Sequence, residues 1–390
     1  MAQVVPFTSA AKPHTEKIMS LSWTPGSSVQ LLTTGANTQI KAYPYLRNLL
    51  LHVYESGTSG GNLAANGQYL ALNSILVSDT NGSGIFGSST FTGFDAYLVH
   101  LLGGYRPTSD PTIVPFYSGV SSTFEYCLRV PFEYNPRTGA GALPNMSANA
   151  TYGLQLYGGT SAQIWQTAPT TIGTVTVDVW MENWTLPDPT DLLGRNQMQG
   201  PPLLGTTQYV TKQQYTGLTA SSSNTVALTR KGNMIRKWIL QTRNSSQALI
   251  AVAGAAGTGP GGGALANPFE FWWDGNRLSS LDPQLMRMYD IEGLGPLLQT
   301  SSLEVLPTGV TTYDWSKPFG RNWGGDGEGG WLATTQSSRL EFTGGSWGGS
   351  SFAELDVITI DVAPIALANQ YALDSASGKL LYPAQPEVRG

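Results

Sequence analysis

The sequence predicts an all-β protein made of two similar halves, and three observations lead to this fold class. The 390-residue chain has only 21 basic and 26 acidic side chains, or 12%, whereas an ordinary soluble protein has about 25%. It is rich in turn-forming residues, with 46 Gly and 24 Pro, and in aromatic ones, with 11 Trp, 17 Tyr and 12 Phe. Five segments of the first half also recur in the same order in the second half.

This composition excludes several classes of protein. Disordered chains have high charge and few aromatic residues, and helical bundles are much richer in Glu, Lys, Ala and Leu. Nucleic-acid binders usually show a strong basic excess, but the net charge here is -5. A large β protein with many turns fits, and the low charge indicates that much of its outer surface does not face water.

Cys127 is the single cysteine, so no intrachain disulfide is possible. It lies in an alternating apolar run, which predicts a buried and unreactive thiol. We expect neither a signal peptide nor a membrane-spanning segment, because the first residues lack an apolar core and no stretch reaches 18 apolar residues. Without a secretion signal, we interpret the glycosylation sequons at Asn145, Asn149, Asn183 and Asn244 as chance matches.

The repeat begins with two strand-like segments and two short helices. Residues 45–53 resemble residues 234–242, with Arg47 matching Arg236. Asp95 and Asp282 each precede apolar residues spaced along one face of a short helix, and an acidic residue suits a helix N-terminus. The apolar residues of these two faces are Leu98, Leu101 and Leu102 in the first half and Leu285, Met288 and Tyr289 in the second.

Three later segments complete the repeat. Pro131-Phe132 matches Pro318-Phe319, residues 154–159 match 340–345, and residues 175–179 match 358–362, which pairs Asp178 with Asp361. The last pair alternates and is rich in β-branched residues, so it predicts a strand. The separation between matching segments changes only from 189 to 183 residues along the chain. Five collinear matches favour a duplication over two unrelated β domains.

Each half therefore contains strands, one short helix after the early strands, and further strands over roughly 165 residues. Short strands separated by Gly/Pro-rich turns indicate a sandwich or barrel, and an eight-stranded jelly roll of two packed sheets has the right size. Prolines between the halves favour an extended connector. The predicted parts are an N-terminal arm (1–20), a first roll (21–186), a Pro-rich linker (187–205), a second roll (206–365) and a C-terminal arm (366–390).

Two tandem rolls, each with a short helix, resemble the double jelly-roll major capsid proteins of tailless icosahedral bacteriophages, especially the tectivirus-like phages with an internal membrane. The resemblance covers about residues 17–365. Local motifs agree: residues 41–51 resemble a first strand, Pro131-Phe132 followed by residues 141–145 resembles a shared segment, and residues 174–184 resemble the strand that closes the first roll.

The resemblance implies a structural protein without enzymatic activity or cofactor. It implies homotrimers that act as pseudo-hexameric tiles of an icosahedral shell around a membrane and genome. The partners would be further copies, other capsid and vertex proteins and membrane lipids, with no sequence-specific nucleic-acid binding. The chain would fold in the bacterial host cytoplasm before joining the virion, in agreement with its unpaired cysteine.

Two basic groups are candidate contact residues. The resemblance implies an N-terminal segment that points inward, where Lys12, His14 and Lys17 could meet anionic lipid headgroups at ~1 kcal/mol per cation. The alternative for this segment is a frayed terminus. A second group consists of four cations that we expect to make polar contacts between subunits rather than bind phosphate. These cations are Arg230, Lys231, Arg236 and Lys237.

Enzymatic signals are weak. Two G-x-S-x-G matches, at residues 57–61 and 344–348, lack the expected strand before and helix after. The only histidines are His14, His52 and His100, which argues against a catalytic triad.

Other loops permit rival functions. Asp326 and Glu328 could form a carboxylate pair or part of a cation site, although a solvated loop is the simpler interpretation. The glycine run at residues 257–263 lacks the Lys-Ser/Thr of a phosphate-binding loop. Trp272-Trp273 could stack on sugars but more often fills a core or interface. The alternatives are therefore a carbohydrate-binding or glycan-processing tandem β-sandwich, or a vertex or receptor-binding protein of the same virion.

Overall fold

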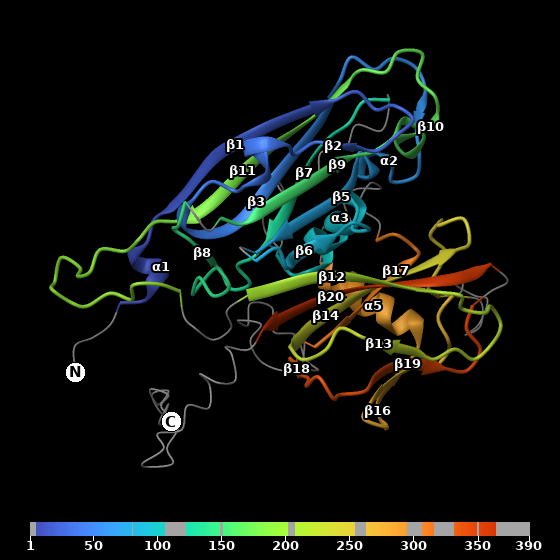
Figure 1. Cartoon of the computed structure of the whole chain (residues 1–390). Coiled ribbons are helices and arrows are strands. Elements are labelled where there is room, and N and C mark those ends of the chain that lie inside the picture. The colour runs from blue at the N-terminus through green and yellow to red at the C-terminus, as the bar shows by residue number, and fades with distance from the viewer. Residues whose placement is uncertain are drawn as a thin grey trace, which may run out of the picture.

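The computed structural model describes residues 5–79, 81–105, 122–148, 151–201, 207–253, 263–294, 306–315, 331–348 and 351–363. These residues form two β-sandwiches, one above the other in Figure 1. We call the part from β1 to β11 roll 1 and the part from β12 to β20 roll 2. Asp326, Glu328, Pro318, Phe319 and the expected C-terminal arm lie outside the described residues.

Roll 1 consists of two sheets. The first has the order β1 (Pro13–Trp23), β11 (Thr174–Trp184), β3 (Tyr43–Ser56) and β7 (Glu125–Pro131), with β8 (Leu143–Asn145) also paired to β3. The second has the order β2 (Gln30–Leu31), β9 (Gly153–Gly158), β5 (Leu72–Ser78) and β6 (Gly84–Ser88). The smaller elements are α1 (Phe7–Ala10), η1 (Gly35–Thr38), β4 (Asn62–Leu63), α2 (Gly67–Leu70), α4 (Ser161–Ile164) and β10 (Trp165–Thr167).

Roll 2 repeats this order strand for strand. Its first sheet runs β12 (Thr207–Thr216), β20 (Phe352–Ala363), β14 (Met234–Asn244) and β17 (Val310–Asp314), with β18 (Leu332–Ala333) on β14. Its second runs β13 (Val226–Leu228), β19 (Leu340–Gly344), β15 (Phe269–Trp273) and β16 (Asn276–Leu281). Helix α3 (Gly93–Leu102) follows β6, and α5 (Pro283–Leu294) follows β16. The strand order therefore supports the duplication predicted from sequence.

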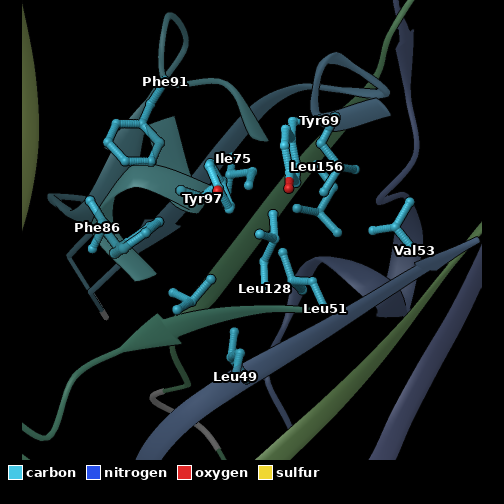
Figure 2. Packing of buried hydrophobic residues seen from close by; sticks show 14 of the residues in the cluster. Leu49, Leu51, Val53, Tyr69, Ile75, Phe86, Phe91, Tyr97, Leu128 and Leu156 are labelled. Atoms are coloured by element: carbon cyan, nitrogen blue, oxygen red, sulfur yellow. The ribbon is translucent and has the colours of Figure 1, made fainter. Parts of the chain in front are cut away.

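Alternation along the strands builds the two cores. In β3, the side chains of Leu49, Leu51 and Val53 are fully buried in roll 1, whereas those of His52 and Tyr54 are only half-buried on the opposite face. Figure 2 shows the inward-facing residues of β3 together with apolar residues from other parts of roll 1. This is the period of two that a sheet with one covered face requires.

The register of the two rolls confirms one sequence match and corrects another. Arg47 and Arg236 are both bulge residues, because the pairing of β3 with β11 and of β14 with β20 skips them. Five residues after each bulge, His52 pairs with Asp178 and Gln241 pairs with Asp356. The counterpart of Asp178 is therefore Asp356, and the expected match to Asp361 was wrong. Similar β-branched runs allow such a slip in a sequence comparison.

The N-terminal arm is shorter than predicted. Residues 13–20 belong to β1, which pairs with β11 along its length, so the boundary expected at residue 20 falls inside a strand. The signal was present in the sequence, because Met19, Leu21 and Trp23 alternate with polar residues and are buried. Before β1, Phe7 is buried against Tyr45 and Trp184.

The linker is folded rather than simply extended. Asp191 accepts hydrogen bonds from the backbone of Leu193 and Arg195 and forms an ion pair with the Arg195 side chain. Val5 forms a bridge with Gln197, which ties this loop to the N-terminal segment, and Figure 1 shows the loop beside α1 at one end of roll 1. Leu192 at its tip is fully exposed.

Two further predictions concern exposure. Cys127 is exposed on β7, because it lies on the outward face between the buried Tyr126 and Leu128; the prediction of a buried thiol was wrong. Partial desolvation of the thiol and the nearby carboxylate of Glu125 nevertheless raise the pKa of Cys127. The sequon asparagines Asn145 and Asn183 are completely buried.

Candidate functional site

A group of buried charges lies where the two rolls meet, a contact that we call the seam. Lys212 Nζ on β12 lies 3.1 Å from Asp95 Oδ2 on α3 and 3.0 Å from Asp356 Oδ2 on β20. Arg243 Nε is 2.9 Å from the same Asp356 oxygen. Both carboxylates are completely buried, and burial raises the pKa of Asp356 although Lys212 and Arg243 oppose the rise. Lys212 thus bridges the two buried carboxylates at the seam, and Arg243 adds a second cation beside Asp356.

Asp95, a member of this group, also caps the N-terminus of α3. The Asp95 carboxylate accepts a hydrogen bond from the Thr92 backbone, and the Thr92 hydroxyl accepts one from Asp95 N, which is a complete capping box. Gln241 Nε2 on β14 donates to Asp95 Oδ1 at 2.6 Å. One residue therefore caps a roll 1 helix and binds roll 2, so the expected role of Asp95 at a helix start is confirmed and extended.

Arg236 and Lys237 also belong to the seam. Arg236 Nη1 donates to the Tyr105 hydroxyl of roll 1 at 3.0 Å and to Gln208 of roll 2, and its guanidinium lies over the Tyr105 and Tyr134 rings. Lys237 Nζ donates to the Leu102 carbonyl at the end of α3 and pairs with Asp314 at 2.8 Å. Both side chains are buried, so the prediction that they contact another subunit was wrong: they hold the two rolls of one chain together.

The other two cations of that group are bound within roll 2. Arg230 forms a two-pronged ion pair with the buried Asp361, and Lys231 donates to the Ser338 carbonyl. Desolvation raises the pKa of Asp361, and Arg230 counters part of the rise. These contacts fix the start of β14 against β20.

The rest of the seam is apolar. Val210, Ile239, Ile358 and Ile360 lie on the outer face of the first sheet of roll 2, yet they belong to the same buried cluster as Leu98 of α3. Val210 also forms a parallel bridge with Phe86, which joins the edge of β12 to the edge of β6. Figure 1 shows α3 between the second sheet of roll 1 and the first sheet of roll 2.

The cations of the N-terminal segment lie on or beside the first sheet of roll 1. The Lys12 backbone N–H donates to Thr185, the His14 ring stacks on Tyr43, and Lys17 Nζ is 2.7 Å from Asp178. The Lys17 and Ser20 side chains lower the pKa of Asp178 against the opposing effect of burial. Lys17 is thus engaged within the fold, while the exposed Lys12 side chain stays available.

A second buried cluster surrounds the first bulge. Arg47 Nη2 is 2.7 Å from the buried Glu133, and Trp184 Nε1 donates to Glu133 Oε1 at 2.6 Å. The Arg47 guanidinium lies 4.1 Å from the centre of the Trp184 ring. Burial raises the pKa of Glu133 despite Arg47. Glu133 directly follows Pro131-Phe132, so that shared segment positions the partner of the bulge arginine.

No arrangement typical of an active site is present among the described residues. Residues 57–61 form a turn after β3, and residues 344–348 begin at the end of β19 with β20 as the next element, so neither serine lies on an elbow before a helix. His52 contacts Glu125 at 2.8 Å on a sheet face, and His100 is buried in α3. No group of three metal-binding side chains occurs in this part of the chain.

The tandem tryptophans of β15 are engaged within roll 2. Trp273 packs against the roll 2 core and Trp272 Nε1 donates to Glu270, which agrees with a structural role for the tandem pair. Of the helices described, none has the length and apolar character needed to cross a bilayer.

Comparison with known proteins identifies the fold. No family model matches the sequence, and no curated protein matches it. The structure is similar to that of the Sulfolobus Turreted Icosahedral Virus (TM-score 0.61, 11% identity, 94% of each chain covered). It is also similar to the major capsid protein P2 from Bacteriophage PM2 (0.52, 11%, 91% of this chain and 99% of that chain) and to the PBCV-1 virus capsid (0.53, 12%, 90% and 94%). Over nine tenths of its length, the chain therefore has the double jelly-roll fold of viral capsid proteins.

Proposed function

We propose that this protein is the major capsid protein of an icosahedral virus, and that three copies form one pseudo-hexameric tile of the shell. The observation that carries the proposal is the repetition: two rolls with one strand order, each with a helix after the same strand, in a chain that is similar over its length to capsid proteins. A tile with six similar sides needs such a repeat, whereas a lectin or a glycan-processing enzyme does not.

The seam supplies the stiffness that a shell tile needs. Charges from α3, β12, β14 and β20 are paired in the seam, with an apolar patch beside them. A contact that combines apolar packing with buried ion pairs resists bending, because any opening exposes unpaired charge. We infer a structural role with neither enzymatic activity nor cofactor.

The finer assignment is a virus related to the tectivirus-like phages, with an internal membrane under the shell. The fully exposed Leu192 and its exposed neighbour Leu193 support lipid contact, because apolar side chains at a loop tip can enter a bilayer interface. The exposed Lys12 is joined to this end of roll 1 through Thr185. Other capsid and vertex proteins would be further partners, in a virion whose subunits fold in the host cytoplasm.

Size-exclusion chromatography with light scattering tests the main proposal. We expect a particle of three times the chain mass of 41.6 kDa, with hexagonal outlines in negative-stain images. A monomer that binds oligosaccharides on a glycan array would refute the capsid function and favour the carbohydrate-binding alternative.

The lipid contact has its own test. Leu192→Ser with Leu193→Ser should reduce cosedimentation with anionic vesicles and leave the trimer intact, because both side chains are exposed. The matched control is Leu31→Ser, which changes an exposed leucine of β2. Equal binding by wild type and the double variant would remove this loop from the proposed membrane contact.

A further inference from the structure

Helices α3 and α5 occupy equivalent places in the two rolls, but the apolar face that is buried on α3 is exposed on α5. Counting from Asp95 and Asp282, Leu98 corresponds to Leu285 and Leu102 corresponds to Tyr289. Leu98 and Leu102 are 0% and 5% exposed, whereas Leu285 and Tyr289 are 43% and 49% exposed. On α3 this is the face that meets roll 2, because Asp95 binds Lys212 and Gln241 and the Leu102 carbonyl binds Lys237.

The exposed apolar residues of roll 2 gather on this one side. Among its described residues, the large apolar side chains that are exposed come from β16 and α5, namely Leu278, Leu285, Met288 and Tyr289. Among the described strands, β16 has no neighbour beyond β15, whereas its counterpart β6 is joined to β12. In roll 1, the side formed by β6 and α3 is covered by roll 2. The equivalent side of roll 2, formed by β16 and α5, is exposed.

Roll 1 offers the matching surface at its other side. Leu50 pairs with Trp180 on the outer face of its first sheet, and both are partly exposed. Counted from the bulges, their counterparts in roll 2 are Ile239 and Ile358, which also pair with each other. Those two are fully buried under roll 1. The same apolar pair is therefore covered in roll 2 and uncovered in roll 1.

We propose that the seam is repeated between copies, with the β16 and α5 side of one chain docked on the outer face of the first sheet of roll 1 of a second copy. This proposal rests on the proposed capsid function and names the surfaces that the trimer uses. Leu285 and Tyr289 cover Leu50 and Trp180, and β16 lies beside β1 as β6 lies beside β12. The contact is heterologous, so copies join head to tail until the ring closes.

The polar positions are complementary as well. His52 is the counterpart of Gln241, and Asp282 is the counterpart of Asp95. In the proposed contact, the place of the hydrogen bond from Gln241 to Asp95 is taken by His52 of the second copy, which also contacts Glu125, and Asp282 of the first, which also accepts from Asn267.

Two single variants test the surfaces. Tyr289→Arg breaks the α5 side and Leu50→Arg breaks the sheet side, and each side chain is at least partly exposed. We expect each purified variant to be a monomer by light scattering, a threefold loss of mass, with the circular dichroism and melting temperature of a folded chain. The control Leu192→Arg should remain a trimer. Trimers from both Tyr289→Arg and Leu50→Arg would overturn the proposed interface while leaving the capsid function in place.

Mixing the two variants tests the head-to-tail geometry. A chain with Tyr289→Arg retains an intact sheet, and a chain with Leu50→Arg retains an intact α5 side, so one good contact can form. We expect an equimolar mixture to contain dimers and no trimers. A mixture that contains only monomers or that restores trimers would contradict a head-to-tail contact. A wild-type chain that is itself monomeric would instead refute the proposed function.

Discussion

Helices α3 and α5 follow equivalent strands of two rolls, and their surroundings are opposite. All ten residues of α3 are buried, whereas α5 buries Met286 and Asp290 and exposes Leu285, Met288 and Tyr289. The sequence predicts one apolar face for both helices, and in α5 that face points away from the chain. The comparison shows that the two rolls differ in what covers them more than in how they are built.

The cores of the two rolls differ in a second way. Leu49 of roll 1 corresponds to Trp238 of roll 2, counted from the bulge arginines. Trp238 is fully buried and its ring packs against Phe271 at 5.1 Å and Phe342 at 5.2 Å between ring centres. Roll 2, with its smaller cluster of buried apolar residues, depends on large aromatic side chains to fill its interior.

The largest effect should come from Trp238→Ala. Removing a buried aromatic side chain from a packed core costs about 3–5 kcal/mol, and here several rings lose a partner together. We expect a lower midpoint in guanidinium unfolding and a large change in intrinsic fluorescence. Leu49→Ala is the matched change in roll 1, with about 2–5 kcal/mol expected. An unchanged midpoint for Trp238→Ala would show that roll 2 does not depend on this cluster.

The seam can be weakened by Lys212→Ala. This change leaves Asp95 and Asp356 buried with one cation fewer, and breaking such a buried pair costs about 3–5 kcal/mol. The control is Lys17→Ala, which removes the partner of Asp178, the counterpart of Asp356, at a more exposed site. There about 0–1 kcal/mol is expected. Similar unfolding free energies for both variants, measured on monomeric chains, would remove the distinction between the seam and the outer face of roll 1.

Asp290 gives α5 a pH dependence that α3 lacks, since Gly103 occupies the corresponding place. Burial raises the pKa of Asp290 to about 6 although Thr311 and Thr312 donate to its carboxylate. The folded state therefore binds the proton more tightly than the unfolded state. The resulting stabilisation is complete below about pH 4 and is lost as the pH rises through about 6.

Asp290→Asn should flatten this dependence between pH 4 and 6. The expected difference is on the order of 2 kcal/mol across the window, measured by urea unfolding at several pH values with wild type as the reference. Parallel pH profiles for the two proteins would contradict the role given to Asp290.

The smallest effect should come from Thr92→Ala at the start of α3. Loss of the cap costs about 1 kcal/mol, and Thr92→Ser, which retains the hydroxyl, is the matched control. Thermal unfolding of the three proteins measures the difference. If Thr92→Ala were as costly as Lys212→Ala, the Asp95 carboxylate would depend on the cap more than on the seam.

Much of the fold could be predicted from the sequence, because apolar periodicity and turn residues recur in both halves. Arg47 and Arg236 matched correctly since a bulge needs the same local pattern in each roll. Asp178 was matched to the wrong residue because alternating β-branched strands look alike after a shift. The exposed face of α5 could not be predicted, since burial of a helix face depends on a neighbouring roll.

The seam was the part of the site that sequence analysis missed. Lys212 has no distinctive motif around it. A signal existed in β20, where Glu354 and Asp356 alternate with apolar residues in a strand that is apolar on both faces. Such a strand has to be covered on both sides, and its carboxylates then need buried partners, which are Lys212 and Arg243 for Asp356 and two glutamine amides for Glu354.

Cys127 lies on the same outer sheet face as Leu50 and His52, and it is paired directly with His52. Because it is the single cysteine of the chain, its alkylation can report on that face without any labelling mutation. In free chains the exposed thiol should react, more slowly than an ordinary cysteine because its pKa is raised. In closed rings a neighbouring copy would shield the thiol, so the alkylation rate of Cys127 measures how much of the protein has assembled.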